Sequence, residues 1–184
     1  SASKAAAESL IHTYYHSYFD TDESSVSIAI GRAGNVIGGG DWANDRIVPD
    51  IFRAWSREES VEIRKPEATR PWQHVLEPLS GYLSLAQQLS DRRELSGEAF
   101  NFGPAANQDV SVQHLLEEMQ RHWHGGKWKA SAPGEGNCKE AHLLRLNCDK
   151  ALNKLSWKPT LFFEETIEMT TDWYSNFYNE KSEI

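Results

Sequence analysis

Apolar side chains recur every three or four residues in several stretches of this chain, a spacing that predicts amphipathic helices. The first stretch is 2–19, where three alanines precede Leu10, Ile11, Tyr14 and Tyr18. Five further stretches show the same spacing: 46–57, 78–89, 112–123, 148–155 and 163–178. The hydrophobic pattern therefore predicts helices over all of these ranges.

Short runs of β-branched and aromatic residues lie between these helices and predict strands. The run 26–30 follows a polar turn and is typical of a strand buried on both faces, as in a parallel sheet. We also predict strands at 61–63, 72–75, 98–102 and 143–146, and one near Trp128 in the otherwise loop-like range 125–139. Helices and strands alternate, which predicts a mixed α/β fold.

Two of the predicted helices begin next to residues suited to capping. Asp45, with Asn44, supplies N-cap chemistry for the helix at 46–57. Pro49 is tolerated there because it falls in the first turn, where its missing N–H is not needed. Ser111 is the expected N-cap of the helix at 112–123.

Composition places the chain among globular proteins: it has 184 residues, of which 39% are hydrophobic. Its 27 acidic residues outnumber its 19 scattered basic ones, which argues against a nucleic-acid-binding surface. Cys138 and Cys148 lack zinc-site spacing and are expected to be reduced thiols. No apolar run approaches the ~20 residues of a membrane helix, and the first residues lack the apolar core of a signal peptide. We therefore expect a soluble, cytoplasmic protein with neither a nucleic acid nor a membrane as partner.

A glycine-rich stretch follows the first predicted strand. Gly31, Gly34 and Gly38 are spaced somewhat like a dinucleotide-binding loop, but such a loop must open directly into a helix. Here a Gly-Gly-Asp-Trp turn intervenes, so we do not expect a dinucleotide site at this position. Asn35 has two readings: its amide contacts a ligand close to the glycine backbone, or it occupies a left-handed turn.

Arg70 is a second candidate for ligand binding. Its planar guanidinium suits phosphate oxygens and stands just before Pro71 and Trp72, although a plain surface arginine is the alternative. His12 and His16 lie one helical turn apart, but nothing nearby offers a third ligand, so we predict no metal site.

Motifs that carry a family resemblance are spread over the whole chain. They are Ser3-Lys4, Arg32-Ala33-Gly34-Asn35, Gly39-Gly40-Asp41-Trp42, Asp45-Arg46, Arg70-Pro71-Trp72-Gln73-His74-Val75, Asn101-Phe102-Gly103-Pro104 and Trp157-x-Pro159. Together they resemble the extended short-chain dehydrogenase/reductase superfamily and, within it, most of all the CDP-glucose 4,6-dehydratases. Asn147 and Ser156 depart from that pattern, which has aspartate and glycine at these places, and both departures look structural.

The resemblance implies the C-terminal part of a Rossmann-type α/β enzyme. Residues 1–184 would hold the end of the Rossmann domain, interleaved with the smaller nucleotide-sugar-binding domain, and the NAD-binding half would lie upstream of Ser1. The implied reaction is the NAD-dependent conversion of CDP-glucose to its 4-keto-6-deoxy form, an early step toward dideoxyhexoses of bacterial surface polysaccharide. In that reaction a tyrosinate takes the C4 hydroxyl proton as hydride passes to NAD, water leaves across C5 and C6, and the hydride returns to C6. Because the tyrosine and the NAD loop would lie upstream, this chain alone is not expected to turn over substrate.

The resemblance also implies roles for individual residues. Lys4 would end a Tyr-x-x-x-Lys motif, hold the nicotinamide ribose and lower the pKa of the tyrosine. The implied substrate-binding residues are Asn35, Arg46, Arg64, Arg70, Asn101 and His142. A homodimer through the first helix is implied as well. Another nucleotide-sugar epimerase or dehydratase, or a non-catalytic binding module, remains the alternative because one scaffold hosts several reactions.

Overall fold

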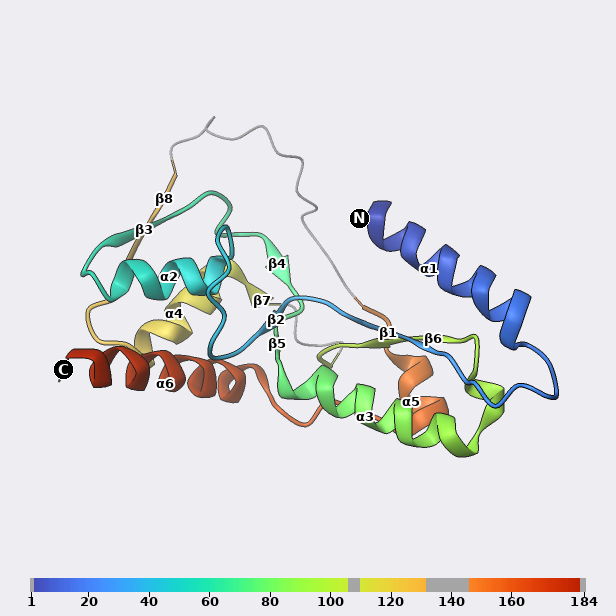
Figure 1. Ribbon diagram of the computed structural model, residues 1–184. Coiled ribbons are helices and arrows are strands. Elements are labelled where there is room, and N and C mark those ends of the chain that lie inside the picture. The colour runs from blue at the N-terminus through green and yellow to red at the C-terminus, as the bar shows by residue number, and fades with distance from the viewer. Residues whose placement is uncertain (1, 106–109, 132–145, 183–184) are drawn as a thin grey trace.

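The computed structural model describes residues 2–105, 110–131 and 146–182, and their fold is mixed α/β (Figure 1). In chain order the elements are α1 (Ala2–Tyr14), the π-helical turn η1 (Tyr15–Phe19), β1 (Ile30–Ala33), β2 (Val36–Ile37), α2 (Ile47–Trp55), β3 (Ser60–Ile63), β4 (Thr69–Arg70), β5 (Gln73–His74), α3 (Leu76–Asp91), the 3-10 turn η2 (Arg93–Leu95), β6 (Ala99–Phe102), β7 (Val110–Ser111), α4 (Val112–His122), β8 (Lys127–Ala130), α5 (Asp149–Leu155) and α6 (Phe163–Ser182).

The strands pair over long sequence separations. β1 runs parallel to β6, β2 to β5 and β3 to β8, whereas β4 and β7 are antiparallel. Parallel pairs require crossover connections, and the helices provide them. The chain therefore returns several times to the middle of the molecule, where segments distant in sequence meet.

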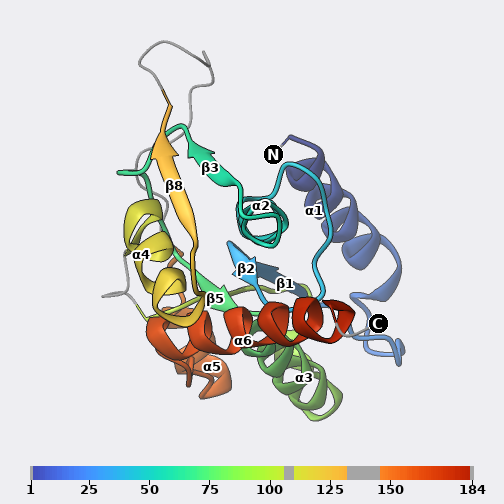
Figure 2. The ribbon, with the colours of Figure 1, turned by 90° about the vertical axis from the view of Figure 1, so that its left-hand side faces the viewer.

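Two hydrophobic cores lie in two lobes, which Figure 1 shows at its left and right sides. In one lobe α2, α4 and α6 pack around buried side chains that include Phe52, Leu115 and Tyr174. In the other, α3 and α5 contact each other and pack against the β1–β6 pair around Phe100 and Phe102. In the turned view, α6 crosses in front of β5 and α3 (Figure 2). The short pair β2–β5 lies between the lobes, since β2 follows β1 and β5 leads into α3.

All of the predicted helices are present, with bounds that differ by a few residues. Ser111 is confirmed as the N-cap of α4, because its Oγ accepts a hydrogen bond from the backbone N–H of His114 at 3.1 Å. Pro49 falls in the first turn of α2, as predicted. Ser156, where the family pattern has glycine, closes α5 in the left-handed conformation with φ of 54°. That conformation explains why glycine is the usual residue there.

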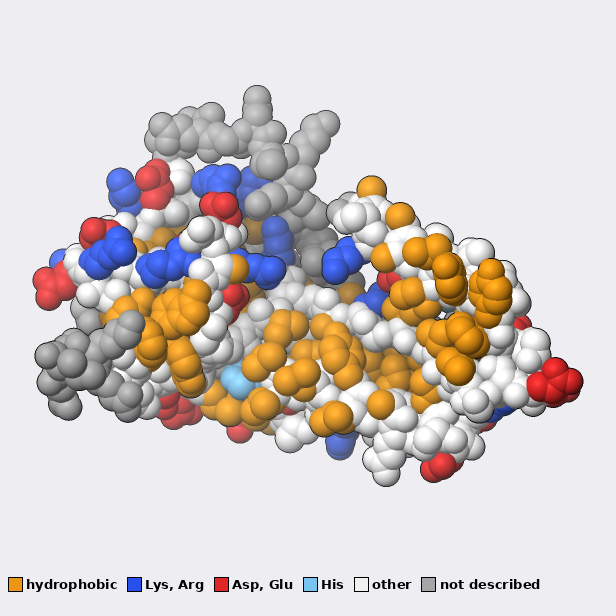
Figure 3. Space-filling view, in the orientation of Figure 1, with side chains coloured by type: hydrophobic (Ala, Val, Ile, Leu, Met, Phe, Trp, Pro, Cys, Tyr) orange, Lys and Arg blue, Asp and Glu red, His pale blue; other side chains and the backbone are white. Residues whose placement is uncertain are grey.

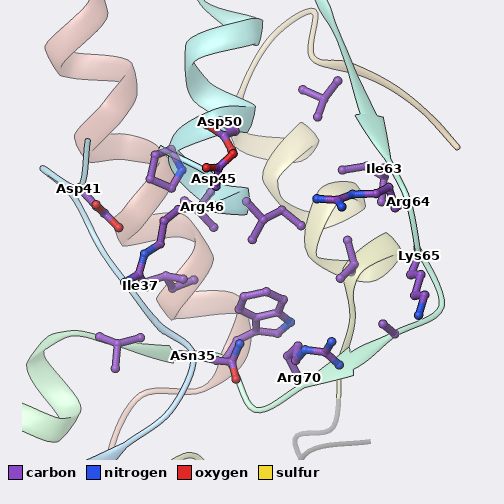
Figure 4. Close-up of a pocket in the computed structure, with 18 of the residues that line it drawn as sticks. Asn35, Ile37, Asp41, Asp45, Arg46, Asp50, Ile63, Arg64, Lys65 and Arg70 are labelled. Carbon is purple, nitrogen blue, oxygen red and sulfur yellow. The ribbon is translucent and has the colours of Figure 1, made fainter. Parts of the chain in front are cut away.

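Two local predictions are wrong. The strand placed at 26–30 begins only at Ile30, because Ile28 bonds the hydroxyl of Ser96 and the N–H of Gly97 before the parallel ladder starts. Asp45 does not cap α2: Arg46 is the N-cap residue and makes no side-chain capping bond. With φ of 59°, Asp45 turns its carboxylate toward a cavity instead (Figure 4).

Strands β3, β5, β6 and β8 confirm the predictions at 61–63, 72–75, 98–102 and near Trp128. The two-residue strands β2, β4 and β7 were not predicted. Residues 143–145 of the strand predicted at 143–146 lie outside the described residues. Among the described residues, no helix combines the length and the apolarity that a membrane span requires.

Candidate functional site

A cavity of about 380 Å³ lies in the lobe that contains α2, beside the strands that lead to the other lobe. Its walls come from the β1–β2 junction, the segment 41–50, the segment from β3 to β4 and the first residue of α4. Its volume is within the range of small-molecule sites. Four separate segments thus form one cavity, an arrangement that only the folded chain produces.

The polar lining of the cavity divides into a basic and an acidic part (Figure 4). Arg64 and Lys65 approach from the loop that follows β3, and Arg70 approaches from β4. Asp41, Asp45 and Asp50 line the opposite wall, beside α2; the lining also includes Arg46. Figure 3 shows Lys and Arg side chains gathered on this lobe, although the chain as a whole carries a formal charge of -8.

Arg46 and Arg64 are the clearest anion-binding groups of the cavity. Within the described part of the chain neither is in an ion pair, whereas the nearby Arg53 bonds Asp50 at 2.5 Å and the carbonyls of Trp42 and Ala43. A guanidinium offers five N–H donors in a plane, which suits a phosphate better than a single carbonyl. The two arginines therefore favour a ligand with an extended anionic group.

Arg70 is held at the edge of the cavity by its own strand. Its guanidinium donates to the carbonyl of Thr69 at 2.8 Å, and β4 pairs with β7. The neighbouring Trp72 is buried, and its indole N–H donates to the carbonyl of Val110 at 3.2 Å. These contacts fix the backbone on both sides of Pro71, so the half-buried arginine stands on a rigid support.

Asn35 has a φ of 48° and so adopts the left-handed turn, which was one of the two interpretations of this residue from the sequence. Asn35 also lines the cavity, so its amide is in a place to contact a ligand, as the other interpretation expects. Figure 4 shows its carboxamide on the same side of the cavity as Arg70. The structure thus brings together four of the expected substrate-binding residues: Asn35, Arg46, Arg64 and Arg70.

The remaining expected site residues lie elsewhere. Asn101 is on β6 and does not line the cavity; its carboxamide accepts a bond from Arg32 at 3.4 Å and donates to the carbonyl of Asn147 at 2.9 Å. Lys4 is exposed on α1, a helix that is linked to β1 by the ion pair of Glu8 with Arg32. His142 lies outside the described residues.

Sequence reasoning did not identify Lys65, Asp45 and Asp50 as lining residues. Lys65 directly follows Arg64 at the end of a predicted strand, and that run of two basic residues was an available signal. Nothing in the local sequence distinguished Asp45 from an N-cap or Asp50 from an ordinary helix residue.

The described residues fit NAD only in part. The glycine-rich stretch after β1 continues into β2, and α2 begins only at Ile47, so it lacks the strand-turn-helix geometry of a dinucleotide pyrophosphate site. Of the expected residues, Lys4 alone would be available to a nicotinamide ribose.

Comparisons with known proteins agree with this architecture. No family model matches the chain. Among solved structures, the UDP-glucuronic acid 4-epimerase from Bacillus cereus, in complex with UDP-glucuronic acid and NAD, has a TM-score of 0.75 at 18% identity and matches 96% of this chain and 52% of its own. The dTDP-glucose 4,6-dehydratase from Bacillus anthracis, in complex with NAD, has a TM-score of 0.69 at 18% identity over 98% of this chain and 52% of its own. The chain thus has the fold of about half of each of these two enzymes.

A sequence match is more specific. The chain is 41% identical over 177 residues to the CDP-glucose 4,6-dehydratase of Salmonella typhimurium, a match that includes 95% of this chain and 49% of that enzyme. This confirms the resemblance that the motifs indicated. The chain spans about half the length of the relatives it matches.

Proposed function

We propose that this chain is the C-terminal, substrate-binding portion of a nucleotide-sugar 4,6-dehydratase that acts on CDP-glucose and uses NAD. The observation that carries the proposal is the cavity in which Asn35, Arg46, Arg64 and Arg70 meet. The identity of 41% to a CDP-glucose 4,6-dehydratase supports the choice of reaction and nucleotide.

In this proposal the basic part of the cavity binds the diphosphate. Arg70 stands on a rigid strand and presents N–H donors, and Asn35 adds a neutral amide on the same side. Arg64, directly after β3, contacts the ribose or stacks on the base, since a guanidinium both donates and stacks. The chain's own residues therefore bind and orient the substrate, and the proton and hydride transfers are left to the rest of the enzyme.

Lys4 is the one residue of this chain that we assign to the reaction centre. We propose that Lys4 ends a Tyr-x-x-x-Lys motif and that its ammonium would lower the pKa of the tyrosine and hold the nicotinamide ribose. Asn101 and His142 remain proposed contributors to the surroundings of the substrate. NAD, when bound, would accept and return the hydride, and this chain alone would not turn over substrate.

We further propose a cytoplasmic homodimer that assembles through α1. Leu10, Tyr14 and Tyr18 on α1 and η1 are 58%, 54% and 65% exposed, a large apolar surface for an isolated helix. Figure 3 shows this apolar surface at its right side. A second copy of the same helix would cover it in a two-fold arrangement.

Competition binding to the complete protein tests the nucleotide assignment. The expected order places CDP ahead of UDP, GDP and dTDP as competitors of labelled CDP-glucose. Preference for another nucleotide would make the protein a different nucleotide-sugar epimerase or dehydratase. Binding without any formation of 4-keto sugar in the presence of NAD would instead favour a non-catalytic binding module.

A further inference from the structure

Gln73 is a buried polar residue to which neither the sequence nor the family resemblance gave a role. Its side chain is 2% exposed and lies where β2–β5 meets the ends of β1 and β6. Its Nε2 donates to the carbonyl of Gly34 at 3.0 Å and to the carbonyl of Phe102 at 2.9 Å. Its backbone N–H donates to the carbonyl of Asn35 at 3.2 Å.

These bonds hold Asn35 from both sides. The carbonyl of Gly34 belongs to the peptide group before Asn35. The angle φ of Asn35 sets the orientation of that peptide group. The carbonyl of Asn35 belongs to the next peptide group, whose orientation is set by ψ. Because Gln73 bonds both carbonyls, one residue fixes both backbone angles of Asn35, including its φ of 48°. That left-handed conformation is one that non-glycine residues adopt rarely.

The amide of Gln73 is not explained by stability alone. Its Oε1 is buried and has no donor partner among the described residues, and an unsatisfied buried acceptor costs free energy. A methionine or leucine would fill a similar volume without that cost. The two donors of Nε2 are therefore the feature that distinguishes glutamine from an apolar residue here.

We infer that Gln73 is a positioning residue that orients the carboxamide of Asn35 toward the diphosphate of the bound nucleotide sugar. The inference rests on the proposed function, since it concerns the same cavity. Gln73 belongs to the segment that also carries Arg70, and the backbone N–H of Trp72 bonds the carbonyl of Arg70 at 3.0 Å. Gln73 thus fixes the position of Asn35 relative to the strand that carries Arg70. Both residues can contact the same diphosphate only if this relative position is kept.

Calorimetric titration of the complete protein with CDP-glucose tests this inference. Gln73→Met keeps the length of the side chain and removes both donors, and we expect affinity to fall roughly fivefold to twentyfold, the scale of one to two hydrogen bonds. Gln88→Met is the matched control, because Gln88 also donates from Nε2 to a backbone carbonyl, but that carbonyl belongs to Leu155, which does not line the cavity as Asn35 does. The control should keep the wild-type affinity.

A double-mutant cycle separates positioning from general damage. In an Asn35→Ala background the carboxamide is gone, so Gln73→Met should then change affinity by less than about twofold. An equal loss in both backgrounds, or no loss from Gln73→Met alone, would overturn the inference. Should Gln73→Met fail to fold, Gln73→Leu enters the same cycle. If wild-type protein does not bind CDP-glucose, the proposed function itself fails, which is a different result from an unaffected Gln73→Met variant.

Discussion

Tyr174 on α6 donates a hydrogen bond of 2.7 Å to the backbone carbonyl of Asp41, 133 residues earlier in the chain. Its ring is fully buried and stacks on Phe52 at a centroid distance of 4.2 Å. Asp41 lines the cavity, so this bond links the last helix of the chain to the wall of the candidate site. The C-terminal helix thereby supports the loop that follows the glycine-rich stretch.

The buried hydroxyl of Tyr174 makes the free energy of unfolding depend on pH in the alkaline range. Burial, and next the charge of Asp41, raise the pKa of its hydroxyl from 10.0 to about 12. Between these values the unfolded chain releases the proton and the folded chain keeps it, so the free energy of unfolding falls as pH rises from 10 to about 12. Tyr174→Phe should remove this part of the pH dependence. Urea unfolding of both proteins at several pH values in this range measures it, and parallel curves would contradict the assignment.

Arg70 supplies the most direct mutational test of the cavity. We expect Arg70→Ala to weaken CDP-glucose binding by roughly 1.5 to 3 kcal/mol, the scale of a hydrogen bond to a charged group. Arg57→Ala is the matched control, since Arg57 is exposed just after α2 and does not line the cavity. Calorimetry that gives equal affinities for wild type and Arg70→Ala would remove Arg70 from the site.

Ser156 offers a prediction about stability that is independent of ligand binding. Its φ of 54° is unfavourable for a residue with a Cβ, and glycine adopts it freely. Ser156→Gly should therefore raise the free energy of unfolding by up to about 1 kcal/mol. Ser84→Gly, inside α3, should lower it by a similar amount. Denaturant unfolding of both variants checks the contrast, and a loss of stability in Ser156→Gly would refute the explanation.

The exposed apolar side chains of α1 predict self-association. Replacement of Leu10 by glutamate places a charge on the proposed two-fold contact and should convert a dimer into a monomer. The comparable change on another exposed apolar residue, Leu152→Glu on α5, should leave the dimer intact. Light scattering of the complete protein distinguishes the two states, and a monomeric wild type would refute dimerisation.

Long amphipathic elements were predictable from sequence, because their packing repeats along the chain. Val112, Leu115, Leu116 and Met119 follow the helical spacing and are all buried in α4, whose start is marked by Ser111. Strands that are only two residues long are too short to show a periodic spacing of apolar residues. β2, β4 and β7 exist because distant partners meet, so no local pattern could show them.

Most of the candidate site was predictable because its residues belong to longer motifs, and Arg64 followed from the family resemblance alone. Asn35 and Arg70 stood in such motifs, and the fold brings them to one cavity. Asp45 had the chemistry of an N-cap, but its left-handed backbone turns it toward the cavity instead. Gln73 belonged to one of these motifs, but its local sequence suggested no role, because the role that we infer depends on the distant carbonyls of Gly34 and Asn35.

The most direct test of the central claim is an experimental structure of the complete protein with CDP-glucose bound. We expect the diphosphate in the cavity, with its oxygens within hydrogen-bonding distance of the carboxamide of Asn35 and the guanidinium of Arg70. A diphosphate bound at another place, with the cavity between β3 and α2 open to solvent, would contradict the account.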